Sequence, residues 1–422
     1  MKICIVATGY PRWPGDFSHV FVHRLAKSLA RLNVEVHVVC PHAIGLAKEE
    51  EVDQVRIHRF QYFYPTSHQT LAYFPGIPEN IRKPINKAKM LPFAVSMASK
   101  MFAVIKRYRI DLINAHWALP SGLVAVLTKK MHGLPVLTTL YGVEVFALKG
   151  PYGGLKPILA WTINNSDKAV AVSDATRDLA DEISGREAVA ILPDPIDTEF
   201  FSPLSRGDEI SEKHQLRNWK VIFSCGRMVE RKGFRYLVEA MPGVIAQFGK
   251  TKLIIAGEGP ERPGLERLAH DLGIGRHVIF PGFVPNEDIQ KYYAACDIFV
   301  LPAIIDRYGD TEGSGTILLE AMATGKPVIG SNVGGIPYAL RHGGGFLVRE
   351  KDPQQIAEMI RVLLGNGELR HRIGNEGRKI VEEEFSCPRI ARRYLEEFEM
   401  LVRAKRQSDV ALQTHDADPK EV

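Results

Sequence analysis

The chain alternates between short apolar runs and longer amphipathic stretches, starting with its first residues. Ile3–Ala7 and Val34–Cys40 are short apolar runs, typical of strands that are buried on both faces of a sheet. Between them, from about Ser18 to Arg31, apolar residues recur at the spacing of a helix. A strand, a helix and a strand in this order predict the start of a parallel, doubly wound sheet.

This alternation breaks once and then starts again. Three prolines interrupt the segment Pro193–Pro203, and the residues that follow it are mainly polar. A new apolar run at Val221–Cys225 and an amphipathic stretch at Phe234–Phe248 repeat the earlier order. We therefore predict a Rossmann-like, doubly wound βαβ domain over residues 1–200 and a second one over residues 201–385.

The two predicted α/β domains are expected to share one cleft. Parallel sheets bind ligands beyond the carboxyl ends of their strands, so two in succession favour a central cleft between facing domains. After the second domain we expect a helix over residues 386–405 that crosses back to the N-terminal domain. The polar residues 406–422 are expected to form a disordered tail.

Composition is ordinary for a water-soluble protein of this length. Of the 422 residues, 45% are hydrophobic and 24% charged, which is enough apolar material for two cores. The opening residues form a short strand rather than a signal peptide, and no stretch reaches the roughly 18 apolar residues of a membrane span. The five cysteines lie far apart without metal-binding spacing, so we expect reduced thiols and a cytoplasmic protein. They are Cys4, Cys40, Cys225, Cys296 and Cys387.

The net charge of +5 is concentrated in the N-terminal half. Residues 82–109 carry eight basic residues and no acidic one. A net charge this small does not indicate a nucleic-acid partner, but the basic, apolar segment suggests peripheral contact with the inner face of a membrane. The alternative is a solvated helix face whose Met and Phe residues pack on the core.

Candidate chemistry centres on the segment Asp306–Gly330, which reads as a glycine-rich loop, a short helix and a buried strand. Glu312 and Glu320 bracket the turn into the helix, and Gly313 and Gly315 keep side chains away from the helix start. A helix start suits a phosphate and carboxylates suit hydroxyl groups, so the segment indicates a phosphorylated sugar. The alternative is a buried helix whose Glu320 lies on a solvated face.

A second loop supplies cations. Arg227 and Lys232 follow the strand Val221–Cys225, and a forked Arg beside a flexible Lys suits a diphosphate leaving group. The alternative is a solvated basic loop. His116 follows another predicted strand, where it is either a cleft residue or a structural histidine.

Other site classes find little support in the sequence. Neither half has a GxGxxG motif after its first strand, and there is no GxxxxGK[ST] or GxSxG motif. Dinucleotide oxidoreductases, P-loop enzymes and α/β-hydrolases are therefore disfavoured. The acidic loop around Asp306, Asp310 and Glu312 has no obligatory metal geometry, so we expect no metal site and no cofactor.

Several motifs together resemble the retaining glycosyltransferases of family 4, the "glycosyl transferases group 1" set with the GT-B fold. The similarity spans about residues 1–400 and is weaker in the N-terminal half. The motifs are Gly226-Arg227-x4-Lys232-Gly233, Gly257-Glu-Gly-Pro260, Gly282-Phe-Val-Pro285, Glu312-x7-Glu320, Gly334-Gly335-Ile336, Asp111-Leu-Ile-Asn-Ala-His116-Trp117 and Leu192-Pro-Asp-Pro-Ile-Asp-Thr-Glu-Phe-Phe201.

The resemblance implies a role for each matching residue. Arg227 and Lys232 would hold the donor diphosphate, and Glu320 would accept from the ribose hydroxyls. Glu312 would hydrogen-bond the donor sugar, which His116 would approach from the other domain. The remaining implied donor contacts are Phe283 and Val284 at the base and Ser314, Gly315, Thr316 and Ile317 at the sugar and phosphate.

The resemblance also implies the reaction: transfer of a sugar from a nucleotide-diphosphate donor to a glycan, lipid-linked or other hydroxyl acceptor. Transfer would retain the anomeric configuration and need no divalent metal. The sequence departs from the family pattern at the candidate acceptor side, which comprises Phe17, Ser18, Tyr141 and Glu144. Two other hypotheses remain open, a nucleotide-sugar epimerase of the same fold and a non-catalytic nucleotide-binding subunit.

Overall fold

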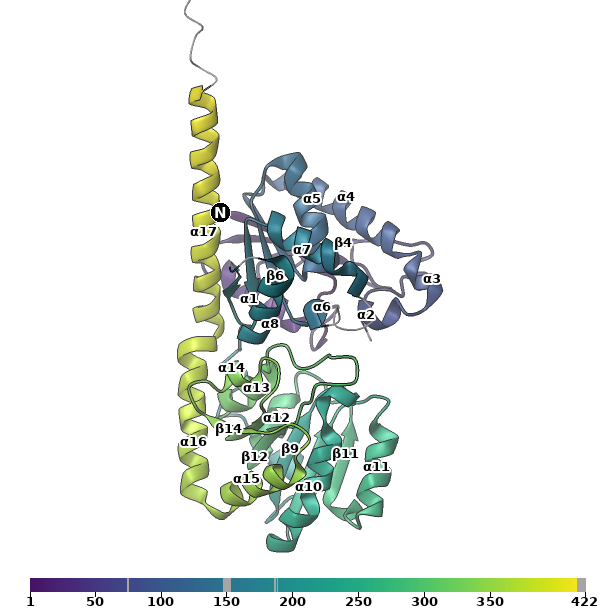
Figure 1. The fold of residues 1–422 in the computed structure, drawn as a ribbon, viewed down its shortest axis with the longest axis vertical. Coiled ribbons are helices and arrows are strands. Elements are labelled where there is room, and N and C mark those ends of the chain that lie inside the picture. The colour runs from purple at the N-terminus through teal and green to yellow at the C-terminus, as the bar shows by residue number, and fades with distance from the viewer. Residues whose placement is uncertain (74–75, 147–152, 186, 188, 416–422) are drawn as a thin grey trace, which may run out of the picture.

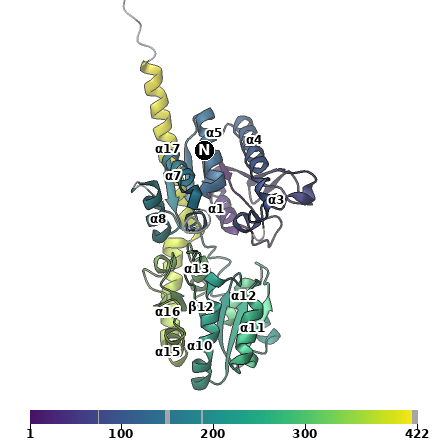
Figure 2. The ribbon, with the colours of Figure 1, turned by 45° about the vertical axis from the view of Figure 1, so that its right-hand side comes forward.

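The computed structural model describes residues 1–73, 76–146, 153–185, 187 and 189–415. It consists of two α/β domains, one above the other in Figure 1, with a long C-terminal helix along one side. Each domain is built on its own sheet, and each sheet lies within one of the two segments expected from the alternation of apolar runs. Figure 2 shows the same two domains from a second direction.

The N-terminal sheet has the strand order β3-β4-β2-β1-β5-β6-β7-β8. Its strands pair in parallel except β3, which is antiparallel to β4 and was not expected from the sequence. The β3 sequence Glu-Glu-Glu-Val is largely exposed, so it carries no apolar signal of a strand. The strands are β1 (Lys2–Val6), β2 (Glu35–Pro41), β3 (Glu49–Val52), β4 (Val55–Phe60), β5 (Leu112–His116), β6 (Val136–Leu140), β7 (Lys168–Ala171) and β8 (Ala190–Ile191).

The C-terminal sheet is wholly parallel, with the strand order β11-β10-β9-β12-β13-β14. Its central strands are buried on both faces, which explains why they read as unbroken apolar runs. The strands are β9 (Lys220–Cys225), β10 (Thr251–Ala256), β11 (Val278–Gly282), β12 (Ile298–Leu301), β13 (Val328–Ser331) and β14 (Gly345–Val348).

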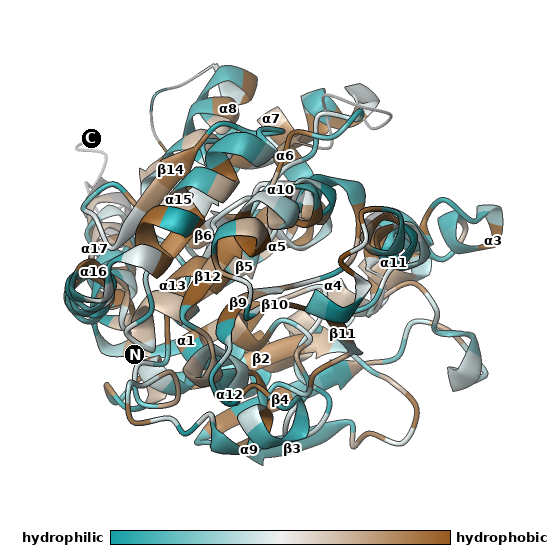
Figure 3. Ribbon diagram, turned by 90° about the horizontal axis from the view of Figure 1, so that it is seen from below, coloured by the Kyte–Doolittle hydropathy of each residue, from teal (hydrophilic) through white to brown (hydrophobic). Residues whose placement is uncertain are grey.

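Helices cover the sheets and turn their polar sides outward (Figure 3). The first domain has α1 (Val20–Ala30), α2 (Ile77–Asn80), α3 (Pro84–Lys87), α4 (Met90–Tyr108), α5 (Leu123–His132), α6 (Val143–Phe146), α7 (Lys156–Asn165) and α8 (Asp174–Ser184). The second has α9 (Asp208–Lys213), α10 (Phe234–Gln247), α11 (Arg262–Asp271), α12 (Ile289–Ala295), α13 (Thr316–Ala323), α14 (Ile336–Ala339), α15 (Pro353–Gly365) and α16 (Gly367–Ile380). The last helix is α17 (Cys387–His415).

The helix α17 returns to the N-terminal domain, as expected, but it is longer than expected. Tyr394 and Phe398 are buried in the same apolar cluster as Ile3 and Ile5 of β1. The helix continues to His415, so the prediction of disorder from residue 406 is wrong for residues 406–415; residues 416–422 lie outside the described part. Polarity had suggested disorder, but the Lys405–Asp409 ion pair, at 2.5 Å and one helical turn apart, supports a polar helix.

The segment Pro84–Tyr108 is long and apolar enough to cross a membrane by length and composition. No such stretch was expected from the sequence, because the helix contains scattered polar residues and therefore no unbroken apolar run. One face of α4 is buried, with Phe93, Met97 and Met101 packed into the core of the N-terminal domain. The alternative interpretation of the basic segment, in which its Met and Phe side chains pack on the core, is confirmed for these three residues.

Candidate active site

A large cleft lies between the two domains and has a volume of about 600 Å³. On one side its walls follow β1, β5 and β6, and on the other they follow β9 and β12. These are the carboxyl ends of parallel strands, where sheets of this type bind ligands. The predicted position of the cleft is therefore confirmed.

Two glycines shape the loop before α13. Gly315 caps the helix with a φ of +66°, a conformation that favours glycine. At Gly313 a Cβ would lie 2.3 Å from the carbonyl oxygen of Tyr141 in the other domain. A side chain at either position would disturb the loop, so these glycines bring the α13 start close to the N-terminal domain.

Cations surround the carboxylate of Glu312. The Lys232 ammonium is ion-paired with Glu312 Oε2, and Arg231 Nη1 lies 3.6 Å from Oε1. Burial would raise the pKa of Glu312, but the charges of Lys232 and Arg231 outweigh burial and hold that pKa below its ordinary value. Glu312 is therefore ionised at neutral pH, with two cations at its side.

Arg227 reaches across the cleft to the N-terminal domain. Its Nη2 lies 2.7 Å from Oε1 of Glu79 on α2. The Glu79 carboxylate therefore lies beside the guanidinium, at a position that an anionic ligand could take. Glu79 could not be recognised from the sequence, because it lies in an aromatic and proline-rich segment without periodicity.

Glu320 is buried at the base of the cleft, with 9% of its surface exposed. Its Oε1 accepts a hydrogen bond from Arg24 of α1 at 3.0 Å, and its Oε2 accepts one from the Tyr293 hydroxyl at 3.2 Å. The alternative of a residue on a solvated helix face is therefore wrong.

A buried aspartate from the inter-domain segment holds the start of α13. Asp194 Oδ2 accepts hydrogen bonds from the hydroxyls of Ser314 and Thr316, each at 3.0 Å. Burial raises the pKa of Asp194 to about 6, even though these two hydroxyls favour its charged form. The segment that joins the domains thus fixes the loop expected to contact donor sugar and phosphate.

His116 does not reach the cleft, contrary to the prediction of a catalytic role. Its Nε2 lies 3.0 Å from Asn114 Oδ1, and its Nδ1 lies 2.5 Å from the Tyr141 hydroxyl. The ring is completely buried, which lowers its pKa to about 3 and keeps it neutral. The buried side chain of His116 contacts the Tyr141 hydroxyl. The structure therefore agrees with the alternative of a structural histidine.

Aromatic rings line the N-terminal wall. Tyr141 packs against Trp117 with ring centroids 4.7 Å apart, and Trp117 meets His19 edge to face at 4.8 Å. Glu144 lies beside them and accepts the backbone N–H of Tyr141 at 3.0 Å, and burial raises the pKa of Glu144 to about 7. This wall therefore offers ring faces together with a carboxyl group that titrates near neutral pH.

The expected base contacts lie at the edge of the cleft. Phe283 is 54% exposed, and its ring packs against that of Phe17 with centroids 5.4 Å apart. Val284 packs on the core of the C-terminal domain. Neither Phe283 nor Val284 lines the cleft, whereas Phe17 does.

The structure brings most of the predicted site residues together. Those that line the cleft are Phe17, Ser18, Tyr141, Glu144, Arg227, Glu312, Ser314, Thr316, Ile317 and Glu320. Those that do not are His116, Lys232, Gly315, Phe283 and Val284. Lys232 nevertheless forms an ion pair with Glu312, which lines the cleft. Within the described part of the chain, no group of three His, Cys, Asp or Glu side chains could hold a metal ion.

Sequence reasoning missed several residues of the cleft. Arg231 lies beside Lys232 in the same loop. The prediction for Lys232 could therefore have been extended to Arg231. Arg24, Glu79 and Asp194 gave no such signal, because each acquires its partner only when the domains come together. His19 was also missed; its side chain is half-buried at the cleft wall, and desolvation lowers its pKa to about 4.

Two family models match the two halves of the chain. "Glycosyltransferase Family 4" matches residues 18–200, and "Glycosyl transferases group 1" matches residues 207–380. A relative from Corynebacterium glutamicum, a GDP-mannose-dependent monoacylated α-(1-6)-phosphatidylinositol monomannoside mannosyltransferase, is 31% identical over 313 residues, which cover 73% of this chain and 80% of the relative. The chain belongs to glycosyltransferase family 4.

Another relative of this glycosyltransferase matches almost its whole length. The N-acetyl-α-D-glucosaminyl L-malate synthase of Bacillus anthracis is 28% identical over 403 residues, covering 93% of this chain and 96% of the synthase. The relatives named here are enzymes that transfer or join glycosyl groups, and they lend no support to an epimerase.

Solved structures confirm the GT-B fold of the glycosyltransferase. The sucrose-phosphate synthase of Thermosynechococcus elongatus has a TM-score of 0.77 at 22% identity, covering 96% of this chain and 99% of that one. The Anabaena protein HepE in complex with UDP has a TM-score of 0.72 at 18% identity, covering 95% and 100%. At these identities the likeness supports the fold alone.

Proposed function

We propose that the glycosyltransferase moves a sugar from a nucleotide-diphosphate donor to a hydroxyl acceptor, with retention at the anomeric carbon and without an obligatory divalent metal. The acceptor is a glycan or a lipid-linked molecule. The donor binds the C-terminal wall of the cleft and the acceptor binds the N-terminal wall. The reaction takes place in the cytoplasm.

The observation that carries this proposal is the cluster of Arg227, Arg231, Lys232 and Glu312 beside the start of α13. As the bond to the sugar breaks, negative charge grows on the leaving diphosphate. Fixed cations in a partly buried site stabilise that charge more than water does. Such cations can do the work that a metal ion does in other transferases, and Glu312 can accept from sugar hydroxyls.

Tyr141 and Trp117 support an acceptor with a sugar ring. Their packed rings form part of the wall that faces Glu312 across the cleft. An aromatic face covers the apolar face of a sugar, and the Glu144 carboxyl beside it can accept from a hydroxyl. Phe17 and Ser18 complete this acceptor side.

The first experiment is a screen of purified enzyme for donor hydrolysis over UDP-, GDP- and ADP-sugars, with and without EDTA. We expect one donor to be hydrolysed at the same rate in both, and NMR of the transfer product to show a retained anomeric configuration. Lys232→Ala and Glu312→Ala should each lower kcat on the order of 10²–10³-fold. Lys291→Ala, at an exposed ion pair on α12, is the control; equal rates in all variants would contradict the assignment.

We also propose that the enzyme contacts an anionic membrane surface through residues 82–109. The outer side of α4 and the neighbouring α5 expose large apolar side chains, although the inner side of α4 is buried. These are Leu91, Val95 and Phe102 on α4 and Leu127 and Met131 on α5. Cations at both ends of α4 would meet lipid head groups while the apolar side chains enter the interface.

Sedimentation with vesicles tests this contact. Wild-type enzyme should sediment with vesicles that contain an anionic lipid and not with neutral ones. Leu91→Glu combined with Met131→Glu should abolish sedimentation, whereas Leu204→Glu, at an 89% exposed position in the other domain, should not. Equal binding to both kinds of vesicle would refute the proposal.

A further inference from the structure

The Glu320 carboxylate is held by one residue from each domain. Arg24 on α1 of the N-terminal domain donates to Oε1 at 3.0 Å, and Tyr293 on α12 of the C-terminal domain donates to Oε2 at 3.2 Å. An ionised carboxylate has about four acceptor positions. Each oxygen therefore keeps one position for a further donor, which matches a pair of neighbouring hydroxyls.

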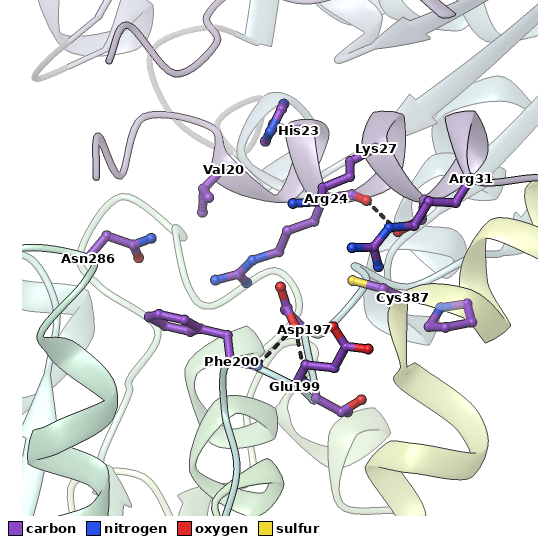
Figure 4. Close-up of a pocket in the computed structure, with 13 residues that line it drawn as sticks. Val20, His23, Arg24, Lys27, Arg31, Asp197, Glu199, Phe200, Asn286 and Cys387 are labelled. Atoms are coloured by element: carbon purple, nitrogen blue, oxygen red, sulfur yellow. Dashed lines mark hydrogen bonds between the residues drawn. The ribbon is translucent and has the colours of Figure 1, made fainter. Parts of the chain in front are cut away.

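Arg24 is itself fixed where the domains join. Its side chain is buried, and its guanidinium carbon lies 5.1 Å from the ring centre of Phe201, on the segment that connects the domains. Arg24 lines both the cleft and a second cavity of about 170 Å³ beside this segment. Figure 4 shows its side chain extending from α1 toward the connecting segment. Arg24 thus contacts both Glu320 in the cleft and the segment that connects the two domains.

We propose that Arg24 is a positioning residue that orients the Glu320 carboxylate toward the donor ribose. The inference rests on the proposed function, because it takes Glu320 as the ribose ligand. A guanidinium has a rigid, planar set of donors, and its hydrogen bonds to a carboxylate are stronger than those of neutral donors. Ribose recognition in the C-terminal domain then requires a residue of the N-terminal domain.

A merely structural ion pair would behave differently. If Arg24 only tied the domains together, its removal would weaken every nucleotide alike. If Arg24 orients Glu320, its removal would weaken ligands that carry both ribose hydroxyls more than ligands that lack the 2′-hydroxyl. Comparing a nucleotide with its 2′-deoxy form therefore separates the two interpretations.

The test measures binding of UDP, GDP and ADP and their 2′-deoxy forms by calorimetry, for the full-length enzyme and four variants. The variants are Arg24→Met, Arg24→Lys, Glu320→Gln and Lys27→Met. Lys27 lies one turn along α1 and pairs with Asp53 at 3.1 Å, so it controls for loss of a cation on the same helix. Thermal melting shows that each variant is folded.

In the wild type and Lys27→Met, the preferred nucleotide should bind about tenfold more tightly than its deoxy form, as expected for one charge-assisted hydrogen bond. In Arg24→Met and Glu320→Gln this ratio should fall below about threefold. The deoxy form, which keeps its 3′-hydroxyl, should lose less affinity than the preferred nucleotide. Arg24→Lys, which keeps the charge, should recover part of the ratio.

Three outcomes would overturn the inference. An unchanged ratio in a folded Arg24 variant, or equal losses for both forms, would leave Arg24 as a structural ion pair. A wild type that binds both forms equally would mean that Glu320 is not the ribose ligand, although the donor class would stand. No binding of any nucleoside diphosphate would refute the proposed function as well.

Discussion

At the scale of single residues, the acids of the cleft differ in whether nearby cations offset the effect of burial on their pKa values. Glu312 stays ionised because Lys232 and Arg231 compensate for its burial. Glu144 and Asp194 have no cation at hydrogen-bond distance among the described residues, and burial raises their pKa values to about 7 and about 6. Three acids of one cleft are therefore suited to different roles. Glu312 is a fixed negative charge, whereas Glu144 and Asp194 can titrate near neutral pH.

The pKa of Glu144 predicts a pH-dependent stability. Because its folded-state pKa of about 7 exceeds the ordinary value of 4.5, the folded protein holds this proton more tightly, and stability falls as pH rises between these two values. Glu144→Gln should remove this loss. Its Tm should exceed that of the wild type at pH 8 by a few degrees and match it at pH 4.5.

Glu182→Gln, at an exposed position on α8, is the control for this change and should alter Tm little at either pH. Equal Tm values for Glu144→Gln and the wild type at pH 8 would show that the Glu144 carboxyl is not desolvated.

At the scale of elements, the loop before α13 and the helix α17 decide how the domains meet. The loop contacts the N-terminal domain through backbone atoms at Gly313, and Ser173 donates to the Gly313 carbonyl at 2.7 Å. The helix α17 carries the chain back and supplies apolar side chains to the first core. The loop before α13 thus joins the two walls of the cleft, and α17 stabilises the N-terminal domain.

Gly313→Ala should disturb the contact between the loop and the N-terminal domain. Its Cβ would lie 2.3 Å from a backbone oxygen that cannot move as a side chain can, so the loop must withdraw. We expect transfer to slow by at least tenfold with little change in Tm. Gly264→Ala on α11, where nothing lies within 4 Å of the added Cβ, should leave both quantities unchanged, and normal transfer by Gly313→Ala would contradict the close contact.

The two halves of α17 should differ in their contribution to stability. Phe398 is completely buried, so Phe398→Ala should lower the free energy of unfolding by about 3–5 kcal/mol. A chain that ends at Val402 loses mainly polar contacts such as Arg406 to Asp111, at 3.8 Å, and should keep its stability within about 1 kcal/mol. Denaturant unfolding measures both, and a large loss on truncation would assign a packing role to the distal half.

At the scale of the whole molecule, two ion pairs bridge the domains across the cleft. Each joins a predicted donor ligand of the C-terminal domain, Arg227 or Glu320, to the opposite charge in the N-terminal domain. These pairs therefore neutralise part of the charge of the predicted donor site within the protein. A bound diphosphate would have to replace Glu79 beside Arg227.

Glu79→Gln should strengthen nucleotide binding, because it removes the carboxylate that competes with the diphosphate for Arg227. We expect the Kd of the preferred nucleoside diphosphate to fall about three- to tenfold at low salt, and the gain to shrink at high salt. Glu212→Gln on α9, away from the cleft, should leave Kd unchanged. Weaker binding by Glu79→Gln would show that Glu79 assists the donor instead.

The fold was largely predictable because its signals are local. Strands buried on both faces must be apolar throughout, and covering helices must be amphipathic, so β1, β2, β9 and most other elements could be recognised from short windows of sequence. The exposed edge strand β3 and the polar end of α17 lacked these signals. Their stability comes from pairing with β4 and from charge pairs along the helix.

The candidate site was predictable only in part. The sequence by itself determined two Rossmann-like domains, the loop with Glu312 and Glu320, and the cationic loop with Arg227 and Lys232, because each depends on neighbours a few residues away. Only the tertiary structure turned His116 inward and paired Arg24 with Glu320. Those outcomes depend on which surfaces meet when two domains pack, and the partners lie up to 296 positions apart in the chain.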